Sequence, residues 1–325
     1  MRGLGTGVAA GALILCVTLS VMTSALAQYP NRVVKIVSPA PPAGATDIIA
    51  RAVSPPLQIA LRQSVIVENR GGAGGYLGME YTAKSAPDGY TLVVGGAFAA
   101  ITATLHKSSG YDPRKDLVPV AIFATVPNML IAGPRLKANS VAELIAYAKA
   151  NPGKVNMGSN GVGTTLHLSG ELFQINTGTR FVHVPYRGWA DAVAALTTGE
   201  VDMMFDLVST ALPNIRAGKT RALAIAGPKR VASLPDVPTL AEAGVKNTEV
   251  ISWFGIMAPA GTPVAVIARL DQAMAQVAKT ESFQQNIHDQ GFDVTYLDSR
   301  QATAFWSAEI DKWTGVIREA DIKPE

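Results

Sequence analysis

Short β-branched runs that each lead through a turn into a helical segment recur along most of this chain. In its first half, the strand-like runs are residues 33–37, 65–68 and 91–94, and the helix-like segments are residues 46–53, 76–84 and 99–105. Because strands that alternate with helices pair in parallel, this order predicts an α/β fold with a mostly parallel sheet. Pro55-Pro56 is expected to end or kink the first helix early.

The second half repeats the alternation and predicts a second sheet. Ser140 followed by Glu143 forms a capping box for a helix over residues 141–150. Further strands are predicted at residues 155–158, 181–184, 201–205 and 223–226, and further helices at residues 164–173, 189–196 and 262–279. Two long apolar stretches, residues 118–132 and 250–258, are candidates to carry the chain between two lobes.

Composition excludes two broad classes. The chain has 325 residues, of which 48% are hydrophobic and 16% are charged, so it can bury a large core and is not predicted to be disordered. Its formal charge is +3, and its lysines and arginines form no visible cluster. A nucleic-acid partner is therefore not expected. The length indicates two domains.

The first 27 residues have the features of a secretory signal peptide. Arg2 precedes an apolar stretch over residues 8–22, and Ala25-Leu26-Ala27 is a small-residue cleavage site. The alternative is a membrane anchor, but about 15 apolar residues fall short of the ~20 that span a bilayer. Cys16 is the only cysteine, and Leu15 before it is too large for a lipoprotein cleavage site. We therefore expect cleavage after Ala27 and a periplasmic, cysteine-free protein.

No catalytic or metal motif stands out. Gly218-Lys219-Thr220 resembles the end of a phosphate-binding loop, but Pro213 occupies the position where that loop needs glycine. His167 and Glu171 lie one helical turn apart, and an ordinary polar contact between them is favoured over metal binding. We expect no cofactor, no metal site and no catalytic residue.

Three loops that follow strand ends and open helices are candidates for anion binding: residues 41–47, 95–99 and 159–165. The first N–H groups of a helix lack intrahelical partners, and the helix dipole favours a negative charge there. Glycine allows close approach to a ligand, and serine and threonine add hydroxyl donors. The candidate ligand-binding residues, two of them outside these loops, are Gly44, Thr46, Asp47, Ala97, Phe98, Ser159, Gly161, Gly163, Thr164, Thr165, Arg187 and Asp206. The alternative is that the loops are ordinary capped turns.

Several longer motifs carry a resemblance to a known family. They include residues 67–75, 86–92, 148–154, 158–163, 183–188 and 258–263. On these motifs the chain closely resembles the Bug family of extracytoplasmic solute receptors, which are the substrate-binding receptors of tripartite tricarboxylate transporters. The resemblance runs over nearly all of the chain after residue 27.

The resemblance implies a two-lobed periplasmic-binding-protein fold of the type II, Venus-flytrap kind. It implies that the lobes close around a small carboxylate and that the receptor, as a monomer, delivers it to membrane permease subunits. The lobe boundaries are expected at residues 28–125 with 253–325 for lobe 1 and at residues 126–252 for lobe 2. In the family, the loop matching residues 41–47 contacts the ligand largely through water, and the loop matching residues 159–165 holds a carboxylate.

The chain also departs from the family pattern. Ala43 stands where the family has glycine, and Trp189 stands where a small residue is more usual. We expect Trp189 to pack on the outer face of its helix; the alternative is that it faces the cleft with Phe98 and that the two rings flank an aromatic acid. Asp206 is expected either to line the pocket or to cap a helix, and Arg187 either to balance the ligand charge or to lie in solvent.

Two functions from different classes remain open at the level of sequence. The first is a non-catalytic receptor for a small organic acid. The second is a periplasmic hydrolase or isomerase that acts on such an acid in the same cleft. The absence of a nucleophile–base motif favours the receptor, but the sequence identifies neither the ligand nor the permease.

Overall fold

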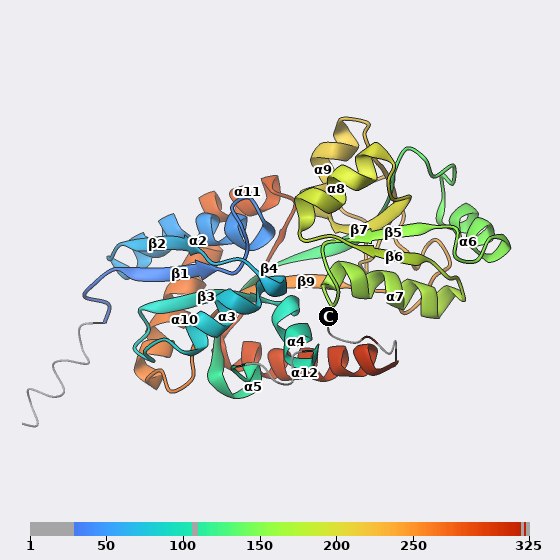
Figure 1. The fold of residues 1–325 in the computed structure, drawn as a ribbon. Coiled ribbons are helices and arrows are strands. Elements are labelled where there is room, and N and C mark those ends of the chain that lie inside the picture. Colours follow the sequence, from blue (N-terminus) through green and yellow to red (C-terminus); the bar gives the residue numbers. More distant parts are fainter. Residues whose placement is uncertain (1–28, 106–109, 320–321, 323–325) are drawn as a thin grey trace, which may run out of the picture.

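The computed structural model describes residues 29–105, 110–319 and 322 and shows two lobes joined by long strands (Figure 1). The predicted signal segment, residues 1–27, lies outside the described residues. The elements of the first half are β1 (Val34–Ser38), α2 (Ala45–Leu61), β2 (Val65–Asn69), η1 (Ala73–Gly75), α3 (Tyr76–Ala83), β3 (Thr91–Gly96), α4 (Ala97–Leu105), α5 (Pro113–Asp116) and β4 (Leu117–Ala132). Within the described part of the chain, no helix has the length and apolar composition of a membrane span.

The second half continues with α6 (Val141–Ala150), β5 (Asn156–Ser159), α7 (Thr165–Thr177), β6 (Val182–Pro185), α8 (Trp189–Thr198), β7 (Met203–Leu207), α9 (Val208–Arg216) and β8 (Arg221–Ile225). The chain then returns through β9 (Ile251–Pro259), α10 (Val264–Lys279), α11 (Glu281–Asp289), β10 (Asp293–Leu297) and α12 (Ser299–Glu319). Most of the strands and helices predicted from the sequence are present, with ends that differ by a few residues.

The first lobe is a sheet covered by helices on both faces. Strands β2, β1 and β3 pair in parallel, with Val34 opposite Val65. Ile36 faces the core formed with α2, α10 and α11, whereas Val37 faces the core formed with α4 and α12 (Figure 1). Successive side chains of a strand point to opposite faces, so a strand covered on both sides is apolar throughout, as this one is.

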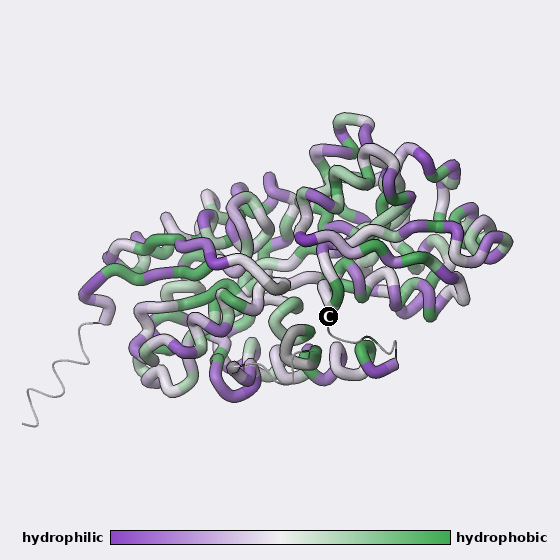
Figure 2. The backbone as a smooth tube through the Cα atoms, viewed as in Figure 1, coloured by the Kyte–Doolittle hydropathy of each residue, from purple (hydrophilic) through white to green (hydrophobic). Residues whose placement is uncertain are grey.

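The second lobe repeats this arrangement around β5. Strands β6 and β7 both pair with β5 in parallel, and helices α6 to α9 surround them (Figure 1). Figure 2 shows hydrophobic residues along the strands and hydrophilic residues concentrated at the outer turns of both lobes. Phe173 of α7 and Phe205 of β7 are among the largest fully buried side chains of this lobe.

Strands β4 and β9 connect the two sheets. β4 pairs with β9 from Leu117 to Pro127, and from Asn128 to Ala132 it pairs with β7 instead. The two apolar stretches expected to cross between lobes are therefore both strands. The exact lobe boundaries given above stay a prediction.

The pairing at the centre differs from the predicted, mostly parallel sheet. Every pairing made by β4 and β9 is antiparallel, including β3 with β9 and β4 with β8 and β10. Parallel pairing depends on a helical crossover between consecutive strands. β4 and β9, which cross between the lobes, are not joined to each other by such a crossover. They pair antiparallel, and the sheets are therefore mixed.

The sequence predicts that Pro55-Pro56 ends or kinks the first helix early, and the first of these two outcomes is wrong. Helix α2 runs through both prolines to Leu61. The prolines lie on its outer side, whereas Val53, Leu57 and Leu61 are buried. Burying a leucine side chain contributes about 1.5–3 kcal/mol. Two such leucines beyond the prolines contribute about 3–6 kcal/mol, which is comparable to the roughly 6 kcal/mol that two interior prolines cost at about 3 kcal/mol each.

Candidate functional site

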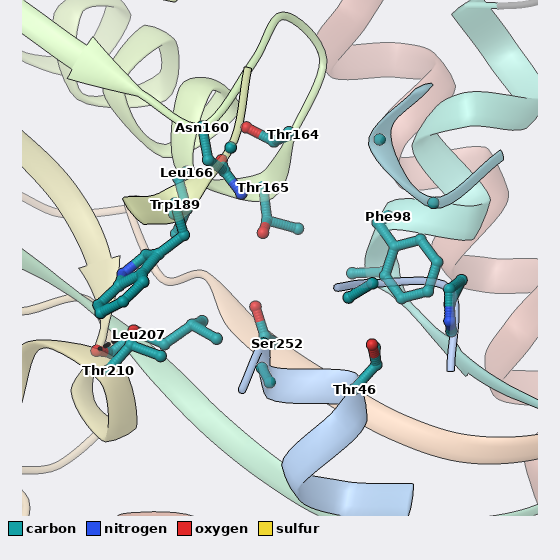
Figure 3. A pocket seen from close by; sticks show the side chains of 18 of the residues that line it. Thr46, Phe98, Asn160, Thr164, Thr165, Leu166, Trp189, Leu207, Thr210 and Ser252 are labelled. Atoms are coloured by element: carbon teal, nitrogen blue, oxygen red, sulfur yellow. Dashed lines mark hydrogen bonds between the residues drawn. The ribbon is translucent and has the colours of Figure 1, made fainter. Parts of the chain in front are cut away.

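A pocket of about 250 Å³ lies between the lobes. Its first-lobe walls come from residues 39–41, 44–46, 72, 74–75 and 97–98, and its second-lobe walls from residues 160, 164–166, 187–189, 206–207 and 210. The start of β9, at residues 252–254, forms its base. Figure 3 shows these side chains around a common space, with Thr165 and Trp189 on one side and Phe98 on the other.

Six helices begin at this pocket. The lining residues include the first residue or the N-cap of α2, α3, α4, α7, α8 and α9. Each helix start presents N–H groups without intrahelical acceptors and the positive end of a dipole. Among the residues that the structure describes, two charged ones line the pocket, Arg187 and Asp206. The backbone therefore supplies much of the positive potential, and the pocket suits a small anion.

The start of α7 combines backbone and side-chain donors. Thr164 is the N-cap, and its hydroxyl donates to the Gly161 carbonyl at 2.9 Å and accepts from the His167 N–H at 3.3 Å. The Thr165 hydroxyl extends into the pocket (Figure 3) and has no hydrogen-bond partner among the described residues. Beside it, the buried Oδ1 of Asn160 also lacks a partner. Thr165 is thus the hydroxyl in this loop that a ligand can engage directly.

The loop before α2 is braced from outside the pocket. The Asp47 carboxylate accepts hydrogen bonds from the Ala43 N–H at 2.9 Å, from Arg51 at 3.0 Å and from Asn69 at 2.9 Å. Burial alone would raise the pKa of Asp47, but these hydrogen bonds outweigh it and hold the pKa below its usual value. Ala43 has φ 65°, a left-handed conformation where glycine is easier to accommodate. The Asp47 contact helps to hold that backbone.

Eight of the twelve predicted residues line the pocket: Gly44, Thr46, Ala97, Phe98, Thr164, Thr165, Arg187 and Asp206. Asp47, Ser159, Gly161 and Gly163 lie outside the lining. That these eight residues contact the ligand stays a prediction. The Thr46 hydroxyl is 3.0 Å from the Ser38 hydroxyl, which orients it at the start of α2.

Ser159 and Gly163 support the α7 loop from behind. The Ser159 hydroxyl lies 2.7 Å from Nε2 of His183, and the Gly163 N–H donates to Nδ1 of His167 at 3.1 Å. The two imidazole rings stack with centroids 3.8 Å apart. Burial, with a smaller contribution from His167, lowers the pKa of His183 to about 4. His183 is therefore neutral at physiological pH and holds Ser159 in place.

His167 also contacts Glu171, with Nε2 and Oε1 3.4 Å apart. This is the polar contact favoured by the sequence over metal binding. In the described part of the chain, no cluster of three or more histidine, cysteine and acidic residues has the arrangement of a metal site.

The expectation that Trp189 packs on the outer face of its helix is wrong. Trp189 lines the pocket (Figure 3). Its indole N–H donates to both carboxylate oxygens of Asp206, at 3.0 and 3.1 Å. A buried indole N–H needs an acceptor, and the acidic residue at the end of β7 supplies one. This contact turns the ring inward.

Asp206 lines the pocket, which is one of the two roles that the sequence left open. It does not cap a helix: the N-cap of α9 is Leu207, whose side chain makes no capping hydrogen bond. The Asp206 carboxylate instead accepts from the Leu207 N–H at 2.8 Å and from the Thr210 hydroxyl at 2.6 Å. Complete burial raises its pKa to about 6, while the hydrogen bonds from Thr210, Trp189 and Leu207 act in the opposite direction. Arg187 lines the pocket with an exposed side chain.

The sequence interpretation missed several lining residues, including Asn160, Thr210, Ser252, Trp253 and Phe254. Asn160 lies inside a predicted binding loop, so its position was available from the sequence. Ser252 and its neighbours lie on a strand rather than at a helix start. Only the crossing of β9 beneath the pocket brings them there.

Comparison with known proteins identifies a family and its structures. The family model described as tripartite tricarboxylate transporter family receptor matches residues 49–322. Protein BugT of Bordetella pertussis is 39% identical over 297 residues, which cover 91% of each chain. Rpa4515 of R. palustris, solved with adipate, is 34% identical with a TM-score of 0.86 and covers 91% of this chain and 100% of its own.

MatC of Rhodopseudomonas palustris, solved with bound malate, is 31% identical with a TM-score of 0.81. That match covers 89% of this chain and 100% of MatC. These likenesses confirm the predicted two-lobed periplasmic-binding-protein fold. They also confirm the family resemblance that the sequence motifs indicated.

Proposed function

Because the chain belongs to the receptor family of the tripartite tricarboxylate transporters, we propose that it captures a small organic carboxylate in the interlobe pocket and delivers it to a membrane permease. The chain is a periplasmic carboxylate-binding receptor, in keeping with relatives that hold adipate and malate. The observation that carries the proposal is the convergence of six helix starts on one pocket that contains a single arginine.

The energetics of this arrangement are sufficient for capture. Each hydrogen bond to a charged group contributes about 1.5–3 kcal/mol. Three such bonds, from backbone N–H groups and the Thr165 hydroxyl, give about 5–9 kcal/mol before the costs of ordering and desolvation. Micromolar affinity corresponds to about 8 kcal/mol. Contact between the apolar walls and the ligand body supplies the remainder.

The two lobes close on the ligand by bending where β4 and β9 cross between the sheets. Lobe 1 consists of residues 28–125 and 253–325, and lobe 2 of residues 126–252. The change of partner of β4 at Asn128 supports a hinge at this point. Hinges of this kind absorb the motion in a few residues at the ends of elements.

The receptor reaches the periplasm through a signal peptide that is removed after Ala27, and it acts there as a monomer. The family description supports delivery to permease subunits of a tripartite transporter. We expect cells that lack the gene for this chain to lose uptake of the bound acid. A plasmid-borne copy of the gene should restore it. Unchanged uptake would contradict the delivery step.

A catalytic role is less well supported. The hydroxyls of Thr46, Thr210 and Ser252 are bonded to Ser38, Asp206 and Asn128 respectively. No histidine among the described residues lines the pocket to act as their base. The geometry therefore favours binding without turnover.

Thermal-shift measurements with a panel of organic acids test the receptor function. A ligand that binds only the folded state stabilises it by about 2.7 kcal/mol at a concentration 100 times its Kd. We expect saturable stabilisation by at least one carboxylate, and chromatography of the same mixture to return the acid unchanged. No stabilisation by any acid contradicts the proposal, and product formation supports the hydrolase or isomerase.

A further inference from the structure

Two aromatic side chains, one from each lobe, line opposite sides of the pocket. Trp189 is the first residue of α8, and Phe98 is the second residue of α4. Both line the pocket, and Figure 3 shows them on opposite sides of it. Leu166 and Leu207 extend the apolar surface on the Trp189 side. Each side of the pocket therefore has an aromatic side chain.

The indole of Trp189 is held in place and cannot bind the ligand through its N–H. Both oxygens of the Asp206 carboxylate accept from that N–H, and Asp206 is completely buried. The same carboxylate accepts from Leu207 and Thr210. Trp189 can offer the pocket only carbon surface, in a fixed orientation.

The ring of Phe98 is held by two glycines. A Cβ added at Gly75 would lie 2.9 Å from the ring, and one added at Gly96 would lie 2.8 Å from it. Such distances are far below a normal carbon–carbon contact. Glycine at both positions therefore makes the space in which the ring lies.

The side-chain groups free to bind an anion lie on the second lobe. Thr165 and Arg187 have no hydrogen-bond or ion-pair partner among the described residues, and both line the pocket. By contrast, the first lobe contributes the Thr46 hydroxyl, which is bonded to Ser38. Asp206, the one acidic residue that the described part of the chain contributes to the lining, is bonded to the Trp189 N–H and repels a second carboxylate there.

We propose that the preferred ligand is an aromatic monocarboxylate whose ring lies between Trp189 and Phe98 and whose carboxylate meets the start of α7. This inference rests on the receptor function proposed above and specifies its ligand class. Stacked aromatic pairs gain roughly twofold to tenfold in affinity beyond the area they bury. A ligand ring that stacks on both Trp189 and Phe98 can gain this increase in affinity twice.

Calorimetric titration of the full-length mature protein with three probes tests the ligand class. The probes are benzoate, cyclohexanecarboxylate, which keeps the size and charge without the aromatic ring, and adipate, which has two carboxylates. We expect benzoate to bind at least fivefold more tightly than cyclohexanecarboxylate and at least tenfold more tightly than adipate. Equal binding of the two ring acids, or tighter binding of adipate, overturns the aromatic assignment and leaves the receptor function standing. If no acid of the wider panel binds, the receptor function itself fails.

Two variants of Trp189 separate stacking from the loss of its hydrogen bond. Trp189→Phe and Trp189→Leu both remove the indole N–H that donates to Asp206. Only phenylalanine keeps an aromatic face. We expect benzoate affinity to stay within threefold in Trp189→Phe and to fall at least tenfold in Trp189→Leu. Tyr147→Leu, at an exposed aromatic residue of α6, is the matched control and should bind as the wild type does. Equal losses in the two Trp189 variants, with unchanged melting temperatures, overturn the stacking role.

Discussion

Replacing Thr165 by alanine removes the one lining hydroxyl that has no protein partner in the described part of the chain. If this hydroxyl donates to the ligand carboxylate, its loss costs about 1.5–3 kcal/mol. Since each 1.4 kcal/mol is a factor of ten in affinity, binding should weaken about 10- to 150-fold. The free protein should keep its stability, because Thr165 is the first residue of α7 and alanine favours a helix more than threonine does.

Thr164→Ala is the matched control for this prediction. It removes the N-cap hydroxyl, which bonds to Gly161 and His167 inside the loop. Loss of a threonine cap costs about 1 kcal/mol of stability. Thr164→Ala should therefore lower the melting temperature of the free protein by about 1–2 °C.

Isothermal titration with the tightest-binding acid of the panel, together with calorimetric melting of each free variant, separates the two effects. The reasoning predicts a loss of affinity without a loss of stability in Thr165→Ala, and a loss of stability in Thr164→Ala. Wild-type affinity in Thr165→Ala would remove this hydroxyl from the binding site. Equal destabilisation by both variants would show that Thr165 supports the helix rather than the ligand.

Three further perturbations test the surrounding structure. Because His183 has a pKa lowered to about 4, its contribution to stability is present above about pH 6.5 and is lost as the pH falls toward 4. Urea unfolding at pH 7 and at pH 5 measures this loss. The free energy of unfolding should decline less between the two pH values in His183→Gln than in the wild type. Replacing Pro55 and Pro56 by alanine restores two helical N–H donors and should raise the free energy of unfolding by up to about 6 kcal/mol, at about 3 kcal/mol for each proline, and unchanged stability would contradict a proline cost of this size. Asn128→Ala leaves buried partners unpaired and should lower that free energy by about 1–3 kcal/mol, with weaker ligand binding as a second readout.

Local signals predicted much of the fold. The helix over residues 141–150 is present as α6, and the Ser140 hydroxyl accepts from the Glu143 N–H as the capping box requires. Helix α2 shows the limit of such signals. Pro55-Pro56 is a strong local signal, but the apolar residues that outweigh it act through contacts with other elements. Burial in the folded chain decided the outcome.

Local signals in the sequence also predicted where the candidate site lies, but not how its side chains are oriented. Helix-capping loops marked where the pocket lies, and eight of the twelve candidate residues line it. The directions of individual side chains were not predictable from these loops. Trp189 turns inward because Asp206 on β7 accepts its N–H, and the Ser159 hydroxyl is directed toward His183 on β6. Each orientation depends on a partner from another element.

The crossing strands and the ligand-binding helix start share one residue. Asn128 lies where β4 changes sheets, and its backbone bonds to Val250 and Ala226. Its side chain accepts from Ser252 at the base of the pocket and donates to Ser169 of α7 at 2.7 Å. A change in the angle between the lobes must therefore either carry the start of α7 along with β4 or break a buried hydrogen bond. Because breaking that bond is costly, α7 should move as one body with the crossing strands, so that the group meeting the ligand carboxylate keeps its orientation while the lobes open and close.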